Sequence, residues 1–123
     1  MKILKNKITD MCWLLFWRNM IKIKIEETGS HIHIEAIGHA NYNVVGQDIV
    51  CSAISALLQT LCYSLEELTK DKVNVSLNKG KSYINIYKPS SKSRILVDSF
   101  FIGCTKIAGV YSDYVEVVMA GEC

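Results

Sequence analysis

The strongest constraint on the fold is a period-two alternation that begins at residue 21. Ile21, Ile23 and Ile25 alternate with lysine and glutamate, and the alternation resumes in residues 31–35 after a turn at residues 28–30. Successive side chains of a β-strand point to opposite faces, so this pattern places the isoleucines on one face and the polar residues on the other. We therefore expect a hairpin of two half-buried strands whose isoleucines face a core.

A helical period follows between about Asp48 and Leu68. The apolar residues of this stretch recur at the spacing of one helix face, and they are Ile49, Val50, Ala53, Ile54, Leu57, Leu58, Leu61 and Leu65. So broad an apolar stripe predicts a helix that packs on the core of the domain.

The second half of the chain repeats this order. Residues 73–77 and 83–87 alternate around a turn that contains Gly80, which predicts a second hairpin. After Pro89, a cap at Ser90 or Ser91 and apolar residues up to 107 predict a second helix that ends near Gly109. Residues 115–119 read as a last strand. The order β-β-α-β-β-α-β predicts an α+β fold with two helices on one face of a mostly antiparallel sheet, whose strand order stays open.

Length and composition indicate one compact domain. The chain has 123 residues, of which 50% are hydrophobic, and these suffice for a single core. The 14 basic and 12 acidic residues give a net charge of +2, too near neutral to predict a surface that follows phosphates. Four cations, Lys88, Lys92, Arg94 and Lys106, are interpreted as a solvated face rather than an RNA-binding patch.

The first nineteen residues do not share the regular pattern of the rest. Their apolar run, residues 11–17, is shorter than a membrane span and has no signal-cleavage pattern after it. We interpret residues 1–19 as an N-terminal extension outside a single domain of residues 20–123, and we expect no membrane association. Five widely spaced cysteines without a CxxC pair favour free thiols in a reducing cytoplasm.

Two residues with catalytic chemistry lie between the first hairpin and the first helix. His39 begins a loop rich in glycine and asparagine, in which Gly38 and Gly46 are candidate hinges, and Cys51 follows near the expected helix start. A thiolate there is stabilised by the helix dipole, and a nearby imidazole would act as its base. The alternative is that Cys51 only packs in the core, as buried cysteines commonly do.

Asp48 and Ser55 flank the candidate nucleophile. Asp48 either caps the helix or orients His39 as the third group of a catalytic triad. Ser55 follows Cys51 by four residues and shares its stripe of the helix. His31 and His33 form a His-x-His pair on a strand, but no third ligand stands at a diagnostic spacing, so we predict no metal site.

The eighteen residues from Gly38 to Ser55, GHANYNVVGQDIVCSAIS, resemble the signature of a known family. The tripeptide GHA, a short loop and then GQDIVCSAIS are similar to the motif of the ribosomal-processing cysteine protease family called Prp. The twelve-residue spacing between His39 and Cys51 is kept, and Ser52 stands where many members have alanine. The resemblance covers the order of elements from Met20 to about Met119.

The resemblance implies a cytoplasmic cysteine endopeptidase that trims a short N-terminal extension from ribosomal protein number twenty-seven of the large subunit. It implies Cys51 as nucleophile, His39 as base, and Asp48 and Ser55 as supporting residues. It further implies a homodimer whose partner is the ribosomal protein precursor, with no cofactor and no direct nucleic acid required. The alternative class is a non-catalytic ribosome-associated binding module in which Cys51 only packs.

Overall fold

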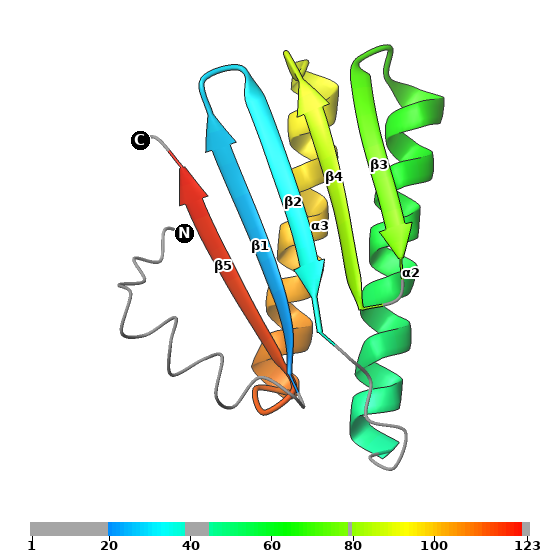
Figure 1. Cartoon of the computed structure of the whole chain (residues 1–123), viewed down its shortest axis with the longest axis vertical. Helices are drawn as coiled ribbons and strands as arrows, with labels where there is room; N and C mark the ends of the chain where they lie inside the picture. The colour runs from blue at the N-terminus through cyan, green and yellow to red at the C-terminus, as the bar shows by residue number, and fades with distance from the viewer. Residues whose placement is uncertain (1–19, 39–44, 79, 122–123) are drawn as a thin grey trace.

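The computed structural model describes residues 20–38, 45–78 and 80–121. In chain order their elements are β1 (Ile21–Thr28), β2 (His31–Ile37), α2 (Val45–Leu68), β3 (Lys72–Asn78), β4 (Lys81–Tyr87), α3 (Ser91–Val110) and β5 (Val115–Gly121) (Figure 1). This is the predicted α+β fold with the predicted order of strands and helices. The second helix ends at Val110, one residue beyond the expected end.

The five described strands form one sheet in the order β3-β4-β2-β1-β5. Both predicted hairpins are present, and antiparallel pairing of β2 with β4 joins them. After α3, the chain returns to the far side of the sheet, where β5 pairs in parallel with β1. The sheet is therefore mostly antiparallel with one parallel edge pair, and β3 and β5 are its edges.

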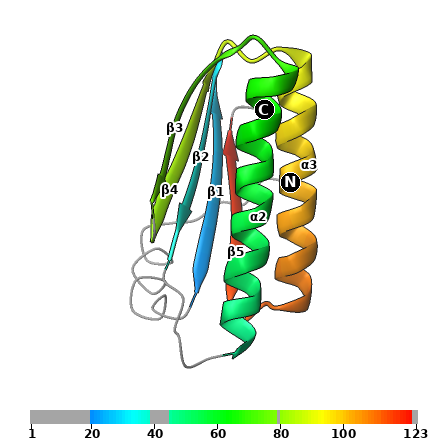
Figure 2. The ribbon, with the colours of Figure 1, turned by 90° about the vertical axis from the view of Figure 1, so that its right-hand side faces the viewer.

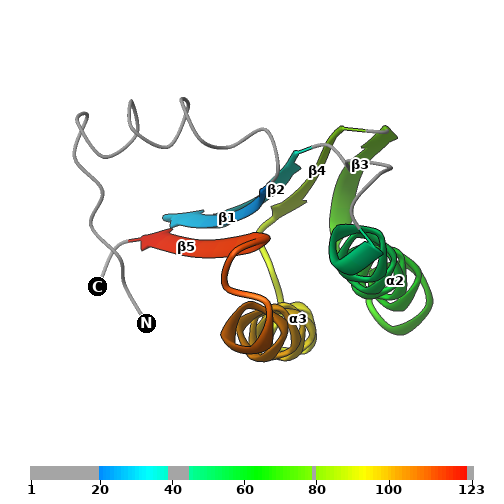
Figure 3. The ribbon, with the colours of Figure 1, turned by 90° about the horizontal axis from the view of Figure 1, so that it is seen from below.

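Both helices cover the same face of the sheet (Figures 2 and 3). The isoleucines of β1 are buried as predicted, since Ile21, Ile23 and Ile25 are only 6%, 0% and 2% exposed. These isoleucines pack in one core with buried residues of β2, β4, α2 and α3. The helix residues in this core are Val50, Ile54, Leu58, Leu61, Leu65, Val97, Phe100 and Cys104.

Helix α2 is the more apolar of the two described helices. Its segment Ile49–Leu68 is long and apolar enough to cross a membrane by length and composition alone. In this fold, however, its residues Val50, Ile54 and Leu65 lie buried in the core. Packing against the sheet therefore accounts for the apolar stripe of α2.

The start of α3 is fixed by a small polar cluster. Ser90 is the N-cap, as one of the two predicted alternatives, and its side chain accepts a hydrogen bond from the Ser93 amide. Asp71, from the connection between α2 and β3, accepts hydrogen bonds from the Ser90 amide (2.8 Å), the Ser90 hydroxyl (2.7 Å) and the Ser93 hydroxyl. The amide of Ser90 first, and then the two hydroxyls, lower the pKa of Asp71 below its usual value.

Replacing Asp71 with alanine should lower the free energy of unfolding by about 1 kcal/mol at pH 7, the usual net cost of lost side-chain hydrogen bonds. Because the pKa of Asp71 is lowered in the folded state, its contribution is complete above the unfolded value of about 3.9 and is lost as the pH falls through the folded pKa. Urea denaturation at pH 7 and pH 3 measures both effects. The exposed Asp113 provides the control: Asp113→Ala should change little, and an equal loss in both variants would refute the role of Asp71.

Candidate active site

Cys51 lies at the edge of the buried face of α2. Its neighbour Val50 is 0% exposed and Ile54 is 3% exposed, so both face the sheet. Each residue of a helix is rotated by about 100° from the one before it, which turns Cys51 toward the side of the core. The thiol is free and half-buried, and it packs against the core while it lines a cavity.

The cavity beside Cys51 has a volume of about 120 Å³ and lies where four segments meet. The start of β1, the end of β2, the first half of α2 and the turn between β3 and β4 contribute to its wall. The lining residues are Ile21, Ala36, Ile37, Gly38, Cys51, Ile54, Ser55, Leu58, Asn78, Gly80, Lys81 and Ser82. The cavity is therefore apolar on the side of the core and polar at Ser55, Asn78 and Lys81.

Two sets of hydrogen bonds hold the polar wall in place. The hydroxyl of Ser82, which is only 9% exposed, donates to the Asn78 carbonyl (2.9 Å) and accepts from the Asn78 amide (3.1 Å). The Gly38 amide donates to the Gly80 carbonyl (3.0 Å) and so ties the end of β2 to the turn. These hydrogen bonds thus hold one wall of the cavity next to Cys51 in place. Sequence reasoning missed Asn78 and Ser82, because only the pairing of β2 with β4 brings this turn to α2.

Gly38 occupies a position where any larger residue would be strained. Its φ of 148° lies in the region that favours glycine, and an added Cβ would lie 2.5 Å from the Met20 carbonyl oxygen and 2.8 Å from the Ile21 Cα. Gly38 was predicted as a loop hinge; in the structure its backbone packs against the start of β1. The second predicted hinge, Gly46, is a helix residue, because α2 begins at Val45.

The early start of α2 also changes the position of Asp48 and Cys51. Asp48 is the fourth residue of the helix, and its two expected roles, as a cap or as the group that orients His39, stay predictions. Apolar periodicity locates only the part of a helix that has a buried face, whereas the helix itself extends further by backbone hydrogen bonds. Cys51 is consequently the seventh residue, and the helix dipole acts on it less than expected, since that effect falls off within the first turn.

The expected base, His39, lies outside the residues that the structure describes, as does the loop through residue 44. Its neighbour Gly38, however, lines the same cavity as Cys51.

The other described cysteines have packing roles, as expected. Burial raises the pKa of the Cys62 thiol, and burial raises the pKa of Cys104 to about 12. Cys104 is completely buried in the core. Both thiols are therefore protonated at neutral pH and unsuited to nucleophilic attack, which leaves Cys51 as the candidate nucleophile among the described residues.

The two histidines of β2 lie on the sheet face opposite the helices. The Oδ1 of Asn85 lies 2.9 Å from the His31 Nε2 and 2.7 Å from the His33 Nδ1, while the His33 Nε2 lies 3.2 Å from the Glu35 Oε1. His31 also stacks on Tyr87. Within the described part of the chain, no three histidine, cysteine or acidic side chains are grouped to hold a metal ion.

A half-buried free thiol that lines a cavity on an α+β scaffold is the kind of arrangement that a thiol enzyme uses. The family model described as cysteine protease Prp matches residues 20–116. The chain therefore belongs to this family of cysteine proteases, as the motif around Cys51 indicated.

Solved structures support the same fold. SMU.848 from Streptococcus mutans is 26% identical with a TM-score of 0.72, and the match covers 85% of this chain and 97% of that one. The essential ribosomal processing protease Prp from S. aureus, in complex with a covalently linked product peptide, is 20% identical with a TM-score of 0.72, and the match covers 81% of this chain and 99% of that one. A second structure of that protease, with a substrate peptide, has a TM-score of 0.68 at 18% identity over 81% of this chain and 99% of that one. No curated protein sequence matches the chain.

Replacing Gly38 with alanine should destabilise the fold by about 1 to 3 kcal/mol, the range of a strained backbone position, and should deform the cleft beside Cys51. Gly29 is the matched control, because its φ of 56° is also positive but nothing lies within 4 Å of an added Cβ. We expect Gly38→Ala to lower the thermal midpoint more than Gly29→Ala. Equal midpoints for the two variants would show that the contact with Met20 is not essential.

Proposed function

We propose that the chain is a cysteine endopeptidase that removes the short N-terminal extension of ribosomal protein number twenty-seven of the large subunit, with Cys51 as nucleophile and His39 as base. One observation carries this assignment. Gly38, which precedes His39 directly, lines the same cavity as Cys51. Support for the substrate comes from the family and from the S. aureus relative, which is a ribosomal processing protease and was solved with substrate and product peptides.

The chemistry follows from these two side chains. His39 takes the proton of the Cys51 thiol, and the thiolate attacks the scissile carbonyl carbon to form a tetrahedral intermediate. The amine leaves with the proton from His39, and an acyl-enzyme remains on Cys51. Water, deprotonated by His39, then attacks the thioester and releases the second product.

The start of α2 supplies donors for the oxyanion. The first four amides of a helix have no partner within it, and in α2 these belong to residues 45–48. Loss of one such donor in comparable sites costs about 2.7 to 4 kcal/mol of transition-state stabilisation. In this proposal Ser55, which lines the cleft, contacts the substrate, and Asp48 orients His39.

The dimensions of the cleft suit an extended peptide. A cavity of about 120 Å³ between Ile37, Ile54 and Leu58 accepts one apolar side chain. The outer edge of β3, which ends at Asn78 on the rim of the cleft, has free backbone groups for a peptide that adds as a strand. We further propose a cytoplasmic homodimer that requires no cofactor and no nucleic acid for cleavage.

A peptide that spans the cleavage site of the precursor should be cut by the wild type, and Cys51→Ala should reduce the rate by at least about 10⁴-fold because the acyl-enzyme can no longer form. Mass spectrometry of the products measures the cleavage. Cys62→Ala is the matched control on the same helix and should keep its activity. A wild type that binds the peptide without cutting it would favour the alternative, a ribosome-associated binding module.

His39 should control the reactivity of Cys51 toward iodoacetamide. A neighbouring imidazole favours the thiolate, so the rate of alkylation of Cys51 should rise at lower pH in the wild type than in His39→Ala. Peptide mapping by mass spectrometry separates Cys51 from Cys62 and from Cys104, whose pKa of about 12 keeps it unreactive. Identical pH profiles in the two proteins would show that His39 and Cys51 do not interact.

A further inference from the structure

Exposed lysines gather at the end of the molecule opposite the cleft, which is the upper end in Figure 1. They come from the segment where α2 connects to β3 and from the segment where β4 connects to α3. The members of this lysine cluster are Lys70, Lys72, Lys88 and Lys92. Asp71 holds the two segments together, because its carboxylate accepts hydrogen bonds from the amide (2.8 Å) and the hydroxyl (2.7 Å) of Ser90.

The lysine cluster carries an excess of positive charge. Within the described part of the chain, none of its members forms an ion pair. Glu27 of β1 pairs with Arg94 instead, and Asp71 is bound by the start of α3. Glu66 and Glu67 in the last turn of α2 are the exposed carboxylates that come before the cluster in the chain. Four cations against two such carboxylates attract a polyanion to this end of the molecule.

An aromatic pair, His31 and Tyr87, lies beside the lysine cluster on the sheet face that neither helix covers (Figure 3). The two rings stack, with centroids 5.0 Å apart and an interplanar angle of 11°. On the other side of β4, Lys72 pairs with Tyr87, and its Nζ lies over the Tyr87 ring, 5.8 Å from the centroid. His31 thus supports one side of the Tyr87 ring, while an exposed lysine covers the other. A planar group can displace this flexible side chain and stack on the ring.

Lys88 adopts a backbone conformation that normally selects glycine. Its φ of 49° makes it the one non-glycine residue with a positive φ among residues 20–38, 45–78 and 80–121. Its amide donates to the Ser30 carbonyl (2.6 Å), which fixes the end of β4 against the turn between β1 and β2. Any residue with a Cβ is less stable than glycine in this conformation. A lysine at a strained position, beside other cations and an aromatic pair, indicates a role for its side chain.

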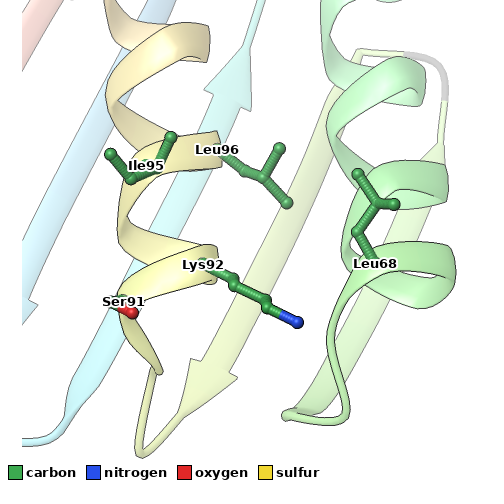
Figure 4. A pocket seen from close by; sticks show the side chains of 5 residues that line it. All are labelled: Leu68, Ser91, Lys92, Ile95 and Leu96. Carbon is green, nitrogen blue, oxygen red and sulfur yellow. The ribbon is translucent and has the colours of Figure 1, made fainter.

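Lys92 extends the lysine cluster to the helix side of the molecule. Figure 4 shows its side chain reaching from the start of α3 toward α2, beside a hollow of about 600 Å³ whose lining includes Leu68 and Ile95. The cations therefore follow a path around the end of the molecule, from Lys72 on the sheet side past Lys88 to Lys92. A strand of successive phosphates can follow such a path, whereas a small anion meets only one part of it.

We propose that the lysine cluster and the aromatic pair bind single-stranded nucleic acid, with one base stacked on Tyr87 in place of the Lys72 ammonium and with phosphates at the lysines. Cations alone attract any polyanion, and the stacked base adds the preference for a single strand, since the bases of a duplex already stack on one another. The sequence favours a solvated face for Lys88 and Lys92, because only strand pairing brings His31 and Lys72 to Tyr87. The surface lies at the opposite end of the molecule from the cleft, so it is independent of peptide cleavage.

Fluorescence anisotropy of a fluorescein-labelled oligoadenylate RNA of ten nucleotides, titrated with the full chain, tests the stacked base. Tyr87→Leu should weaken binding at least about tenfold, because the ring is lost, and Tyr87→Phe should keep the wild-type affinity. Tyr63→Leu is the matched control, since Tyr63 is an exposed tyrosine on α2. The DNA of the same sequence identifies the source of the ligand. Equal binding shows that bases and phosphates suffice, and tighter binding of RNA shows that the ribose hydroxyl contributes; both results support the proposal.

The salt dependence of the same titration tests the lysines. Lys72→Gln and Lys88→Gln should each lower the slope of log affinity against log salt by about 0.7, the value for one phosphate contact on a single strand. Lys106→Gln, an exposed lysine near the other end of α3, should leave the slope unchanged. Lys88→Gly should lose the same slope and keep or raise the thermal midpoint, because glycine adopts a positive φ without strain. A loss of both slope and midpoint in Lys88→Gly would assign Lys88 to the fold alone.

Three results would overturn the proposal. They are a wild type that binds neither oligonucleotide at about 50 mM salt, binding that Tyr87→Leu leaves unchanged, and a salt slope that the changes at Lys72 and Lys88 do not alter. A duplex of the same length that binds as tightly as the single strand would show a general attraction of polyanions and count against the stacked base. Cleavage of the precursor peptide should be the same in all these variants, so a failure here is distinct from a failure of the peptidase assignment.

Discussion

The structure depends on the burial of a row of isoleucines between the sheet and two helices. Ile23, Ile34, Ile84 and Ile86 are 0% exposed and come from three neighbouring strands. Burying a side chain of this size contributes roughly 1.5 to 3 kcal/mol, so this layer is the main source of stability. Without this layer neither helix would have a surface to pack on, and the cavity beside Cys51 would lack its apolar wall.

The packing of helix α2 on this layer sets the positions of Cys51 and Ser55. Val50 and Ile54 fix its rotation about its own axis because they are buried, and this rotation carries Cys51 and Ser55 to the cleft. Gly38, whose backbone lies close to Met20 and Ile21, lines the same cavity and directly precedes His39 in the sequence. The geometry of the site therefore follows from core packing on one side and from a backbone contact that needs glycine on the other.

The helices present three different sides to their surroundings. One side is buried on the sheet, a second side of α2 lines the cleft, and a third side leaves Tyr63, Ile95 and Ile102 exposed. The exposed side costs free energy in a monomer, because apolar side chains stay in contact with water.

The sequence by itself determined which residues form the strands and helices, which faces are buried, and that Cys51 rather than Cys62 or Cys104 is the candidate nucleophile. These properties are local, because the spacing of apolar residues and the residues of a motif can be recognised within a short segment of the sequence. The start of α2 at Val45 escaped this reasoning, since its first turn has no apolar stripe.

Only the tertiary structure decided the strand order, the parallel pairing of β5 with β1 and the wall of the cleft. Asn78, Gly80 and Ser82 are distant in sequence from Cys51, and their position depends on the pairing of β2 with β4. Two strands with the same alternation can pair with several partners at similar local energy, so the choice is made by how all the buried faces fit together over one core.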